Sequence, residues 1–266
     1  IEDAWDLEEF NEVLEKLQSL DEVEYAIDFK MNTGQGEWYT YGFSPIIQSW
    51  GADLIDRSDF QSADGVLNSP EAVEALTWFQ TLFRKGYANV LPAGDDDFYG
   101  RKIAALSFVG HWMWGPHSKG LGDNLVLIPM PKLGDKAVTG MGSWNWGITS
   151  QSEHPDAAWK FLEYLIEPEQ ILRMTNANGA VPARKSALAM SDLFGTGGPL
   201  SIFVEQLDGG VAVTRPETPA YPTITTAFAE AVQNIVNGAD VKTELDKAVQ
   251  KIDQDIEDNR GYPITD

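Results

Sequence analysis

The sequence predicts an α/β protein in which short buried strands alternate with amphipathic helices. The most informative strand is Ile103–Phe108, an apolar run of the length that a buried strand has. Gly110 ends this run, and two tryptophans, Trp112 and Trp114, follow directly. Ligands of open α/β sheets bind beyond the carboxyl ends of the strands. We therefore expect these indoles to line a site for a ligand with flat apolar faces, such as a sugar ring; the alternative is that both belong to the core.

The other elements follow from apolar periodicity and from capping residues. Ser69-Pro70-Glu71, for example, combines a cap, a proline in the first turn and an acidic neighbour, which together predict a helix start. Helices are predicted at residues 3–20, 44–51, 69–85, 155–165, from 167 onward, 200–207, 223–237 and 245–256. Strands are predicted at residues 24–29, 103–108 and 124–128, with a further short strand after residue 146.

Two further aromatic clusters lie beside glycines. The first, at 37–43, follows a glycine loop and contains Trp38 and Tyr41. The second contains Gly142, Ser143 and Trp144. A later segment, 215–222, has three prolines in eight residues, so it cannot be helical and forms a rigid extended connection instead.

The composition is that of an ordinary globular protein except for its acidity. Hydrophobic residues make up 43% and charged residues 23%, but the net charge is -22. Nucleic acids and anionic membranes require basic patches, so neither is an expected partner. The absence of cysteine excludes disulfides, thiolate metal sites and a cysteine nucleophile. The acidity suits an exported or a salt-adapted protein, whose carboxylates keep the surface hydrated. No run is long enough to span a bilayer, and the acidic start is unlike a signal peptide and resembles the middle of a longer protein.

The sequence contains no motif of a metal-dependent, nucleophilic or nucleotide-dependent enzyme. The histidines lack metal-site spacing, and Asp95–Asp97 lacks the ligand spread of a calcium loop. We therefore predict no catalytic residue, no metal and no cofactor. A glycoside hydrolase is the enzymatic alternative because it requires only two carboxyl groups. Glu37 and Asp97, which lie beside aromatic clusters, are the candidates for that pair.

Several stretches together resemble the extracellular solute-binding proteins of bacterial and archaeal ABC importers, in the maltose-binding-protein-like group. The likeness depends on their order along the chain, since no single stretch is specific. They are Tyr41-Gly-Phe-Ser-Pro45, Ser69-Pro-Glu-Ala-Val73, Gly100-Arg-Lys-Ile-Ala-Ala-Leu106 with Gly110-His-Trp112, Gly142–Ile148 with His154–Leu162, Val181–Ser186, and Arg215-Pro216 with Tyr221.

The resemblance implies a type II periplasmic-binding-protein-like fold, which holds a carbohydrate between two lobes and delivers it to the transmembrane subunits of an ABC permease. Trp112 corresponds to the aromatic that stacks on the sugar, and Tyr41 to an aromatic of the same lobe. The expected ligand-binding set also includes residues of the two hinge segments and two further aromatics. The hinge-side segment supplies Gly142, Ser143 and Trp144, the second crossing supplies Arg215 and Tyr221, and the further aromatics are Trp38 and Trp114.

The resemblance also implies that the chain holds mainly the carboxyl-terminal lobe. Residues 1–143 are expected to form its first part, 144–185 a hinge crossing and a segment that packs on the amino-terminal lobe, and 186–266 the second crossing and the last helices. We therefore expect an exposed apolar face on the helix at 155–165, which a dimer or a second chain would cover. The expected location is extracellular or periplasmic, with a lipoprotein anchor through a missing amino terminus. A polyamine is the alternative solute.

Overall fold

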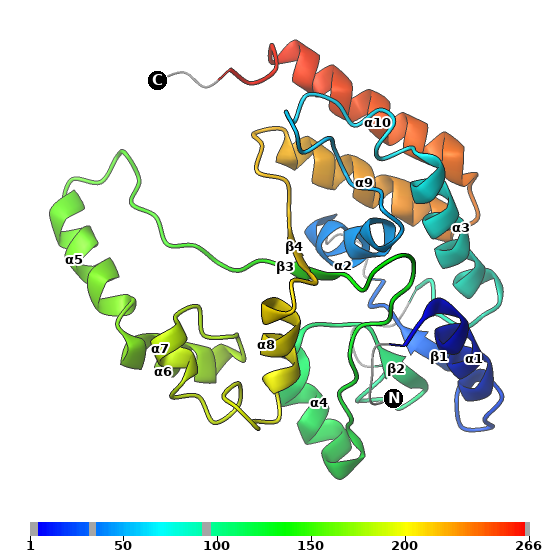
Figure 1. Cartoon of the computed structure of the whole chain (residues 1–266), viewed down its shortest axis with the longest axis horizontal. Helices are drawn as coiled ribbons and strands as arrows, with labels where there is room; N and C mark the ends of the chain where they lie inside the picture. Colours follow the sequence, from blue (N-terminus) through cyan, green and yellow to red (C-terminus); the bar gives the residue numbers. More distant parts are fainter. Residues whose placement is uncertain (1–4, 32–35, 92–96, 264–266) are drawn as a thin grey trace. The chain divides into compact units, whose positions relative to one another are not determined.

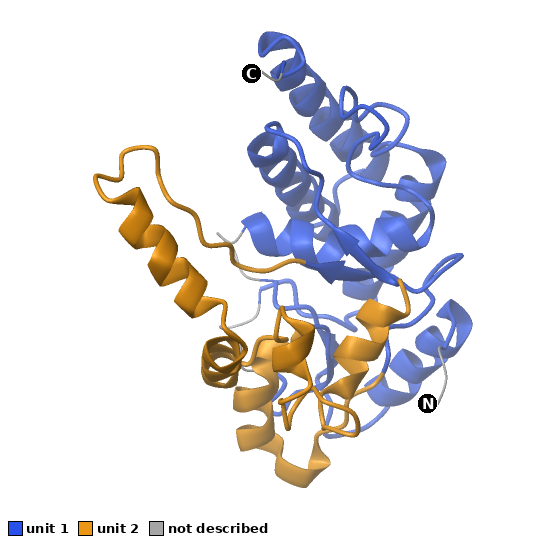
Figure 2. Ribbon diagram, turned by 60° about the vertical axis from the view of Figure 1, so that its left-hand side comes forward, with its two compact units in different colours: residues 1–109, 129–141, 211–266 blue, residues 110–128, 142–210 orange. Residues whose placement is uncertain are grey.

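A computed structural model describes residues 5–31, 36–91 and 97–263 of the chain. The chain divides into two compact units, which Figure 2 shows in blue and orange. Unit 1 comprises residues 1–109, 129–141 and 211–266, and unit 2 comprises residues 110–128 and 142–210. The division into lobes at residues 143 and 185 stays a prediction.

Unit 1 contains two pairs of parallel strands. Strand β1 (Tyr25–Asp28) pairs with β2 (Ala104–Ser107), and Ile27 lies opposite Leu106. The first was predicted from alternation at 24–29 and the second from the apolar run at 103–108, and the structure confirms both with shorter bounds. Strand β3 (Thr139–Met141) pairs with β4 (Ala212–Thr214), and Gly140 lies opposite Val213. This second pair was not predicted, because three-residue strands carry too little periodicity to be recognised.

Unit 1 contains five long helices (Figure 1), and several phenylalanines lie in its core. Phe79 is fully buried, and its ring centroid lies 5.0 to 5.2 Å from those of Phe29, Phe43 and Phe83. Helix α9 packs against both α2 and α10. The helices are α1 (Leu7–Gln18), α2 (Gly36–Ser49), α3 (Pro70–Arg84), α9 (Tyr221–Val236) and α10 (Val241–Asp258).

The first helix begins later than predicted, because a different acid caps it. The Asp6 carboxylate accepts from the amide of Glu9, and the Glu9 side chain accepts from the Asp6 amide, which completes a capping box. The predicted cap, Asp3, lies outside the described residues. The cap of α3 is Ser69, as predicted, and its side chain accepts from the amide of Ala72.

Helix α2 begins eight residues earlier than the sequence predicts. The prediction began a helix at Ser44-Pro45, whereas the structure begins it at Gly36 and places Pro45 inside it. Proline has no N–H, so Pro45 cannot donate the helix hydrogen bond to the carbonyl of Tyr41, four residues earlier. The burial of ten of the fourteen residues of α2 offsets this loss.

Two predicted strands are wrong. Residues 125–128 have no ladder partner among the described residues, and Val126 is 73% exposed. Residues 142–149 are also irregular, because the strand at this position precedes the tryptophans rather than following them. An apolar run therefore forms a strand only where a partner strand is available.

Unit 2 is built from short helices: α4 (Trp114–Leu121), α5 (Pro155–Leu165), α6 (Pro168–Asn178), α7 (Lys185–Leu188) and α8 (Ser201–Asp208). Helix α5 is amphipathic, yet it contains no buried residue. Trp159, Phe161 and Tyr164 are 56%, 58% and 47% exposed. The predicted apolar face of this helix is Ala158, Phe161, Leu162 and Leu165. It is uncovered as expected, with Phe161 exposed and the other three partly exposed. In neither unit do the described residues form a helix with the length and apolar character that crossing a membrane requires.

Candidate functional site

Three predicted ligand-binding residues, Tyr41, Arg215 and Tyr221, lie together in unit 1 around a carboxylate that was not among them. The carboxylate is that of Glu37, in the first turn of α2. Arg215 Nη1 donates to Glu37 Oε1 over 2.5 Å, and the Tyr221 hydroxyl lies 2.9 Å from both carboxylate oxygens. Thr225 Oγ1 donates to Oε2 over 3.1 Å. We call Glu37, Tyr41, Arg215, Tyr221 and Thr225 the Glu37 cluster.

The cluster is assembled from two distant parts of the sequence. Glu37 and Tyr41 are four residues apart on α2, and this spacing places them on one helix face. Arg215 follows β4 directly, and Tyr221 begins α9. Residues 215–220 are non-helical, as predicted. The prediction that 221–222 are non-helical is wrong, because Tyr221 and Pro222 form the first turn of α9, where proline is tolerated. Arg215 and Tyr221, at the two ends of this connection, reach the same carboxylate.

The electrostatics of the cluster are those of a neutralised carboxylate. The guanidinium of Arg215 pairs with Glu37 and lies 5.2 Å above the centroid of the Tyr41 ring. Burial, followed by the charge and hydrogen bond of Glu37, raises the pKa of the Tyr221 hydroxyl far above its usual value. Burial also raises the pKa of Tyr41, although Arg215 opposes that shift. Both tyrosines therefore remain protonated hydrogen-bond donors near neutral pH.

Tyr41 is held by a close approach between α2 and β3. Its hydroxyl donates to the carbonyl of Gly140 over 3.3 Å. A Cβ atom at Gly140 would lie 2.7 Å from the Tyr41 carbonyl oxygen and 3.4 Å from ring atom Cε2. Glycine is therefore required at this position for the two backbones to pass. The stacking role predicted for Tyr41 stays a prediction.

Trp38 lies on the same helix, and its ring centroid is 6.4 Å from that of Tyr41. Its Nε1 donates to the carbonyl of Phe29 over 3.3 Å, and its ring meets Phe43 edge-on. The indole is therefore fastened to the core of unit 1 beside the Glu37 cluster.

The other predicted residues belong to unit 2, and the stacking role predicted for Trp112 stays a prediction. It lies in a short 3-10 turn, His111–Met113, and is 37% exposed. A Cβ atom at Gly110 would lie 2.0 Å from the Trp112 ring, so glycine leaves the space that the indole occupies. The neighbouring His111 ring contacts Phe194 and Phe203, and its Nδ1 donates to the Gly179 carbonyl over 2.7 Å. Burial lowers the pKa of His111, which favours a neutral, structural imidazole.

The remaining predicted residues of unit 2 differ in exposure. Trp144 is 95% exposed, and Gly142 and Ser143 are exposed beside it. Trp114 is half-buried at the start of α4. Their contribution to ligand binding stays a prediction.

The structure excludes Asp97 as one of the two catalytic carboxylates considered for a glycoside hydrolase. The Asp97 side chain is 1% exposed and accepts hydrogen bonds from Arg101 and Asn89. Its position is that of a structural carboxylate, which cannot reach a sugar.

Within the described ranges, no group of three or more His, Asp or Glu side chains could hold a metal ion. Asp95 and Asp96, considered for calcium, lie outside those ranges.

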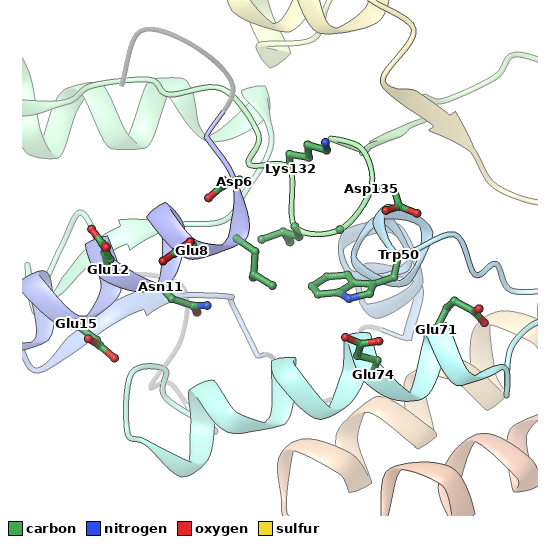
Figure 3. A pocket seen from close by; sticks show the side chains of 13 residues that line it. Asp6, Glu8, Asn11, Glu12, Glu15, Trp50, Glu71, Glu74, Lys132 and Asp135 are labelled. Atoms are coloured by element: carbon green, nitrogen blue, oxygen red, sulfur yellow. The ribbon is translucent and has the colours of Figure 1, made fainter.

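A separate acidic pocket of about 860 Å³ lies beside α1 (Figure 3). Trp50 and Lys132 contribute to its wall, and none of the predicted ligand-binding residues does. Seven carboxylates line it: Asp6, Glu8, Glu12, Glu15, Glu71, Glu74 and Asp135. Its potential is therefore negative, which excludes anionic ligands.

Comparisons with known proteins give a consistent result. Residues 2–194 match the model of a family described as bacterial extracellular solute-binding protein. The maltodextrin-binding protein MdxE of Bacillus subtilis (strain 168) is 26% identical over 191 residues, which cover 67% of this chain and 45% of that protein. This chain thus aligns with less than half the length of that relative.

Solved structures confirm the predicted fold. The sugar-binding protein MalE of Xanthomonas citri is 18% identical with a TM-score of 0.77, over 97% of this chain and 65% of that chain. UgpB of Mycobacterium tuberculosis, solved with glycerophosphocholine, is 19% identical with the same TM-score of 0.77, over 97% and 64%. The fold is thus the predicted α/β, type II periplasmic-binding-protein-like fold.

The close approach at Gly140 predicts a specific effect on stability. The Gly140→Ala variant should lose about 1–3 kcal/mol in the free energy of unfolding, because its Cβ overlaps backbone that must shift. Urea denaturation followed by circular dichroism measures this loss. Gly147→Ala is the matched control, since a Cβ there meets nothing within 4 Å. Equal stability of the two variants would contradict the close approach.

Proposed function

Because the chain belongs to the family of bacterial extracellular solute-binding proteins, we propose that it is the substrate-binding component of an ABC importer for a carbohydrate, specifically an oligosaccharide. The Glu37 cluster is the observation that carries this proposal. It brings a carboxylate, a guanidinium and two hydroxyl groups beside the aromatic rings of Tyr41 and Trp38. Carbohydrate sites combine the same two chemistries, since a sugar has apolar ring faces and a polar edge.

The relatives support a carbohydrate more than another solute. MdxE is named for maltodextrin and MalE for a sugar, whereas UgpB was solved with glycerophosphocholine. The fold alone therefore accepts solutes of different chemistry. Support for a carbohydrate comes from the pairing of aromatic rings with uncharged or neutralised polar groups in the Glu37 cluster.

The proposed mechanism is a clamp. The ligand shifts an equilibrium between open and closed forms of the intact two-lobed protein, because only the closed form makes both sets of contacts. The closed form then presents the carbohydrate to the transmembrane subunits of the permease. Extracellular or periplasmic location, with a lipid anchor at the amino terminus, would hold the protein near those subunits.

The exposed face of α5 supports a further part of this proposal. Helix α5 contains no buried residue, and the large side chains of Trp159, Phe161 and Tyr164 are about half exposed or more. Exposed apolar side chains of this size commonly mark a surface that a partner covers. About a third of each solved relative lies outside the alignment with this chain, since the alignments cover 64–65% of their length. We propose that a further lobe covers α5 in the intact protein, and that a second copy covers it when the 266-residue chain is alone.

A cationic solute such as a polyamine is the second candidate, and the acidic pocket beside α1 favours it. Seven carboxylates and one indole, Trp50, line that pocket. A cation would gain from the negative potential and from the face of the indole.

Trp112→Ala should weaken carbohydrate binding by about 1–3 kcal/mol, by analogy with aromatic stacking on other flat ligands. Calorimetric titration of the intact protein with maltotriose measures this change. Trp112→Phe, which keeps a ring, should retain most of the affinity. Unchanged affinity in the alanine variant would remove Trp112 from the site.

The 266-residue chain alone should dimerise with increasing concentration, and the Trp159→Ser/Phe161→Ser variant should stay monomeric. Size-exclusion chromatography with light scattering measures both masses. Val126→Ser is the control, because Val126 is also exposed in unit 2 but lies outside α5. A wild-type chain that stays monomeric throughout would contradict coverage of α5 by a second copy.

A further inference from the structure

Glu37 is held in place from three sides before any ligand arrives. Its carboxylate accepts from Arg215, Tyr221 and Thr225, and Thr225 is in turn 2.8 Å from the hydroxyl of Thr40 on the same helix. A side chain fixed in this way loses little conformational entropy when it binds a ligand. The arrangement is therefore that of a preorganised polar group.

The pair of Glu37 and Arg215 nevertheless remains accessible. The Glu37 side chain is 48% exposed and that of Arg215 is 29% exposed. A guanidinium has five N–H donors, and among the described residues Arg215 donates a side-chain hydrogen bond to Glu37 through Nη1. The Glu37 carboxylate has about four acceptor positions and already accepts from three donors, Arg215, Tyr221 and Thr225, so about one position is left for a ligand hydroxyl. Both groups thus keep hydrogen-bonding capacity on their solvent side.

The charges of the pair select among ligand classes. Glu37 and Arg215 neutralise one another, so a cation finds no uncompensated carboxylate and a phosphate finds no uncompensated guanidinium. A hydroxyl group, in contrast, donates to a carboxylate and accepts from a guanidinium. Two adjacent hydroxyl groups therefore match the pair without disturbing its charge balance.

We propose that Glu37 and Arg215 form a neutral donor–acceptor subsite that binds adjacent hydroxyl groups of the carbohydrate. Glu37 then determines whether the subsite accepts a neutral or a charged solute. One hydroxyl donates to Glu37, and its neighbour accepts from Arg215. This inference rests on the proposed function and adds to it a residue and a reason for excluding charged solutes from the Glu37 cluster.

The test compares Glu37→Gln with Glu230→Gln in the intact protein. Glu230 is the matched control because its side chain is 54% exposed and forms an ion pair with Lys251 on the surface of unit 1. Both substitutions preserve side-chain size and remove one exposed ion pair, so both variants are expected to fold. Calorimetric titrations use maltotriose, spermidine and glycerophosphocholine as probes.

Glu37→Gln should bind maltotriose about 10- to 100-fold more weakly than wild type, which is the loss expected for hydrogen bonds to a charged group. It should also gain affinity for glycerophosphocholine, because Arg215 is left without its counter-charge. Glu230→Gln should match wild type for every probe.

The outcomes separate this inference from the proposed function. Wild-type affinity for maltotriose in Glu37→Gln would overturn the subsite, while the binding by wild type would still uphold carbohydrate as the ligand. Failure of the wild-type protein to bind maltotriose and longer maltodextrins would overturn both. Tighter binding of spermidine by wild type than by Glu37→Gln would instead assign Glu37 to a cation site and overturn the neutral pair.

Discussion

The close approach of Gly140 to Tyr41 is the constraint on which the rest of the site depends. Helix α2 and strand β3 can meet only because residue 140 has no side chain. The carbonyl that Gly140 approaches is that of Tyr41, which receives no helix hydrogen bond from Pro45. The contact fixes β3, and the pairing of β3 with β4 then fixes the start of the chain segment that carries Arg215. Two separate parts of the sequence thereby reach one carboxylate.

The Glu37 cluster illustrates how a strongly acidic protein can build a site without net charge. The chain carries a net charge of -22, and carboxylates line the pocket beside α1. At Glu37 the guanidinium of Arg215 cancels the local charge, and the same guanidinium lies over the ring of Tyr41. A neutral polar edge beside aromatic rings suits a carbohydrate, whereas the excess of carboxylates over basic side chains beside α1 suits a cation. The location of the charge, rather than its total, separates the two candidate ligands.

Much of the fold could be predicted from the sequence, because the relevant signals are local. The cap at Ser69, the apolar run that includes β2 and the apolar face of α5 all depend on residues close together in the chain. The β3–β4 pair could not be predicted, since it joins residues about seventy positions apart through strands of three residues. Glu37 was considered only as a catalytic acid, because the stretch containing it was interpreted as non-helical. A helical interpretation would have placed Glu37 and Tyr41 on one face.

The measurement that tests the account most directly is a tryptophan-fluorescence titration of the intact protein. The panel contains neutral mono- and oligosaccharides, with spermidine and glycerophosphocholine as charged competitors. Of the nine tryptophans, Trp38 lies beside the Glu37 cluster and Trp50 lines the acidic pocket, so both sites can report on binding. The account predicts a saturable change with at least one neutral oligosaccharide that the charged solutes do not reverse. A flat response to every sugar, with saturation by spermidine or glycerophosphocholine, would contradict it.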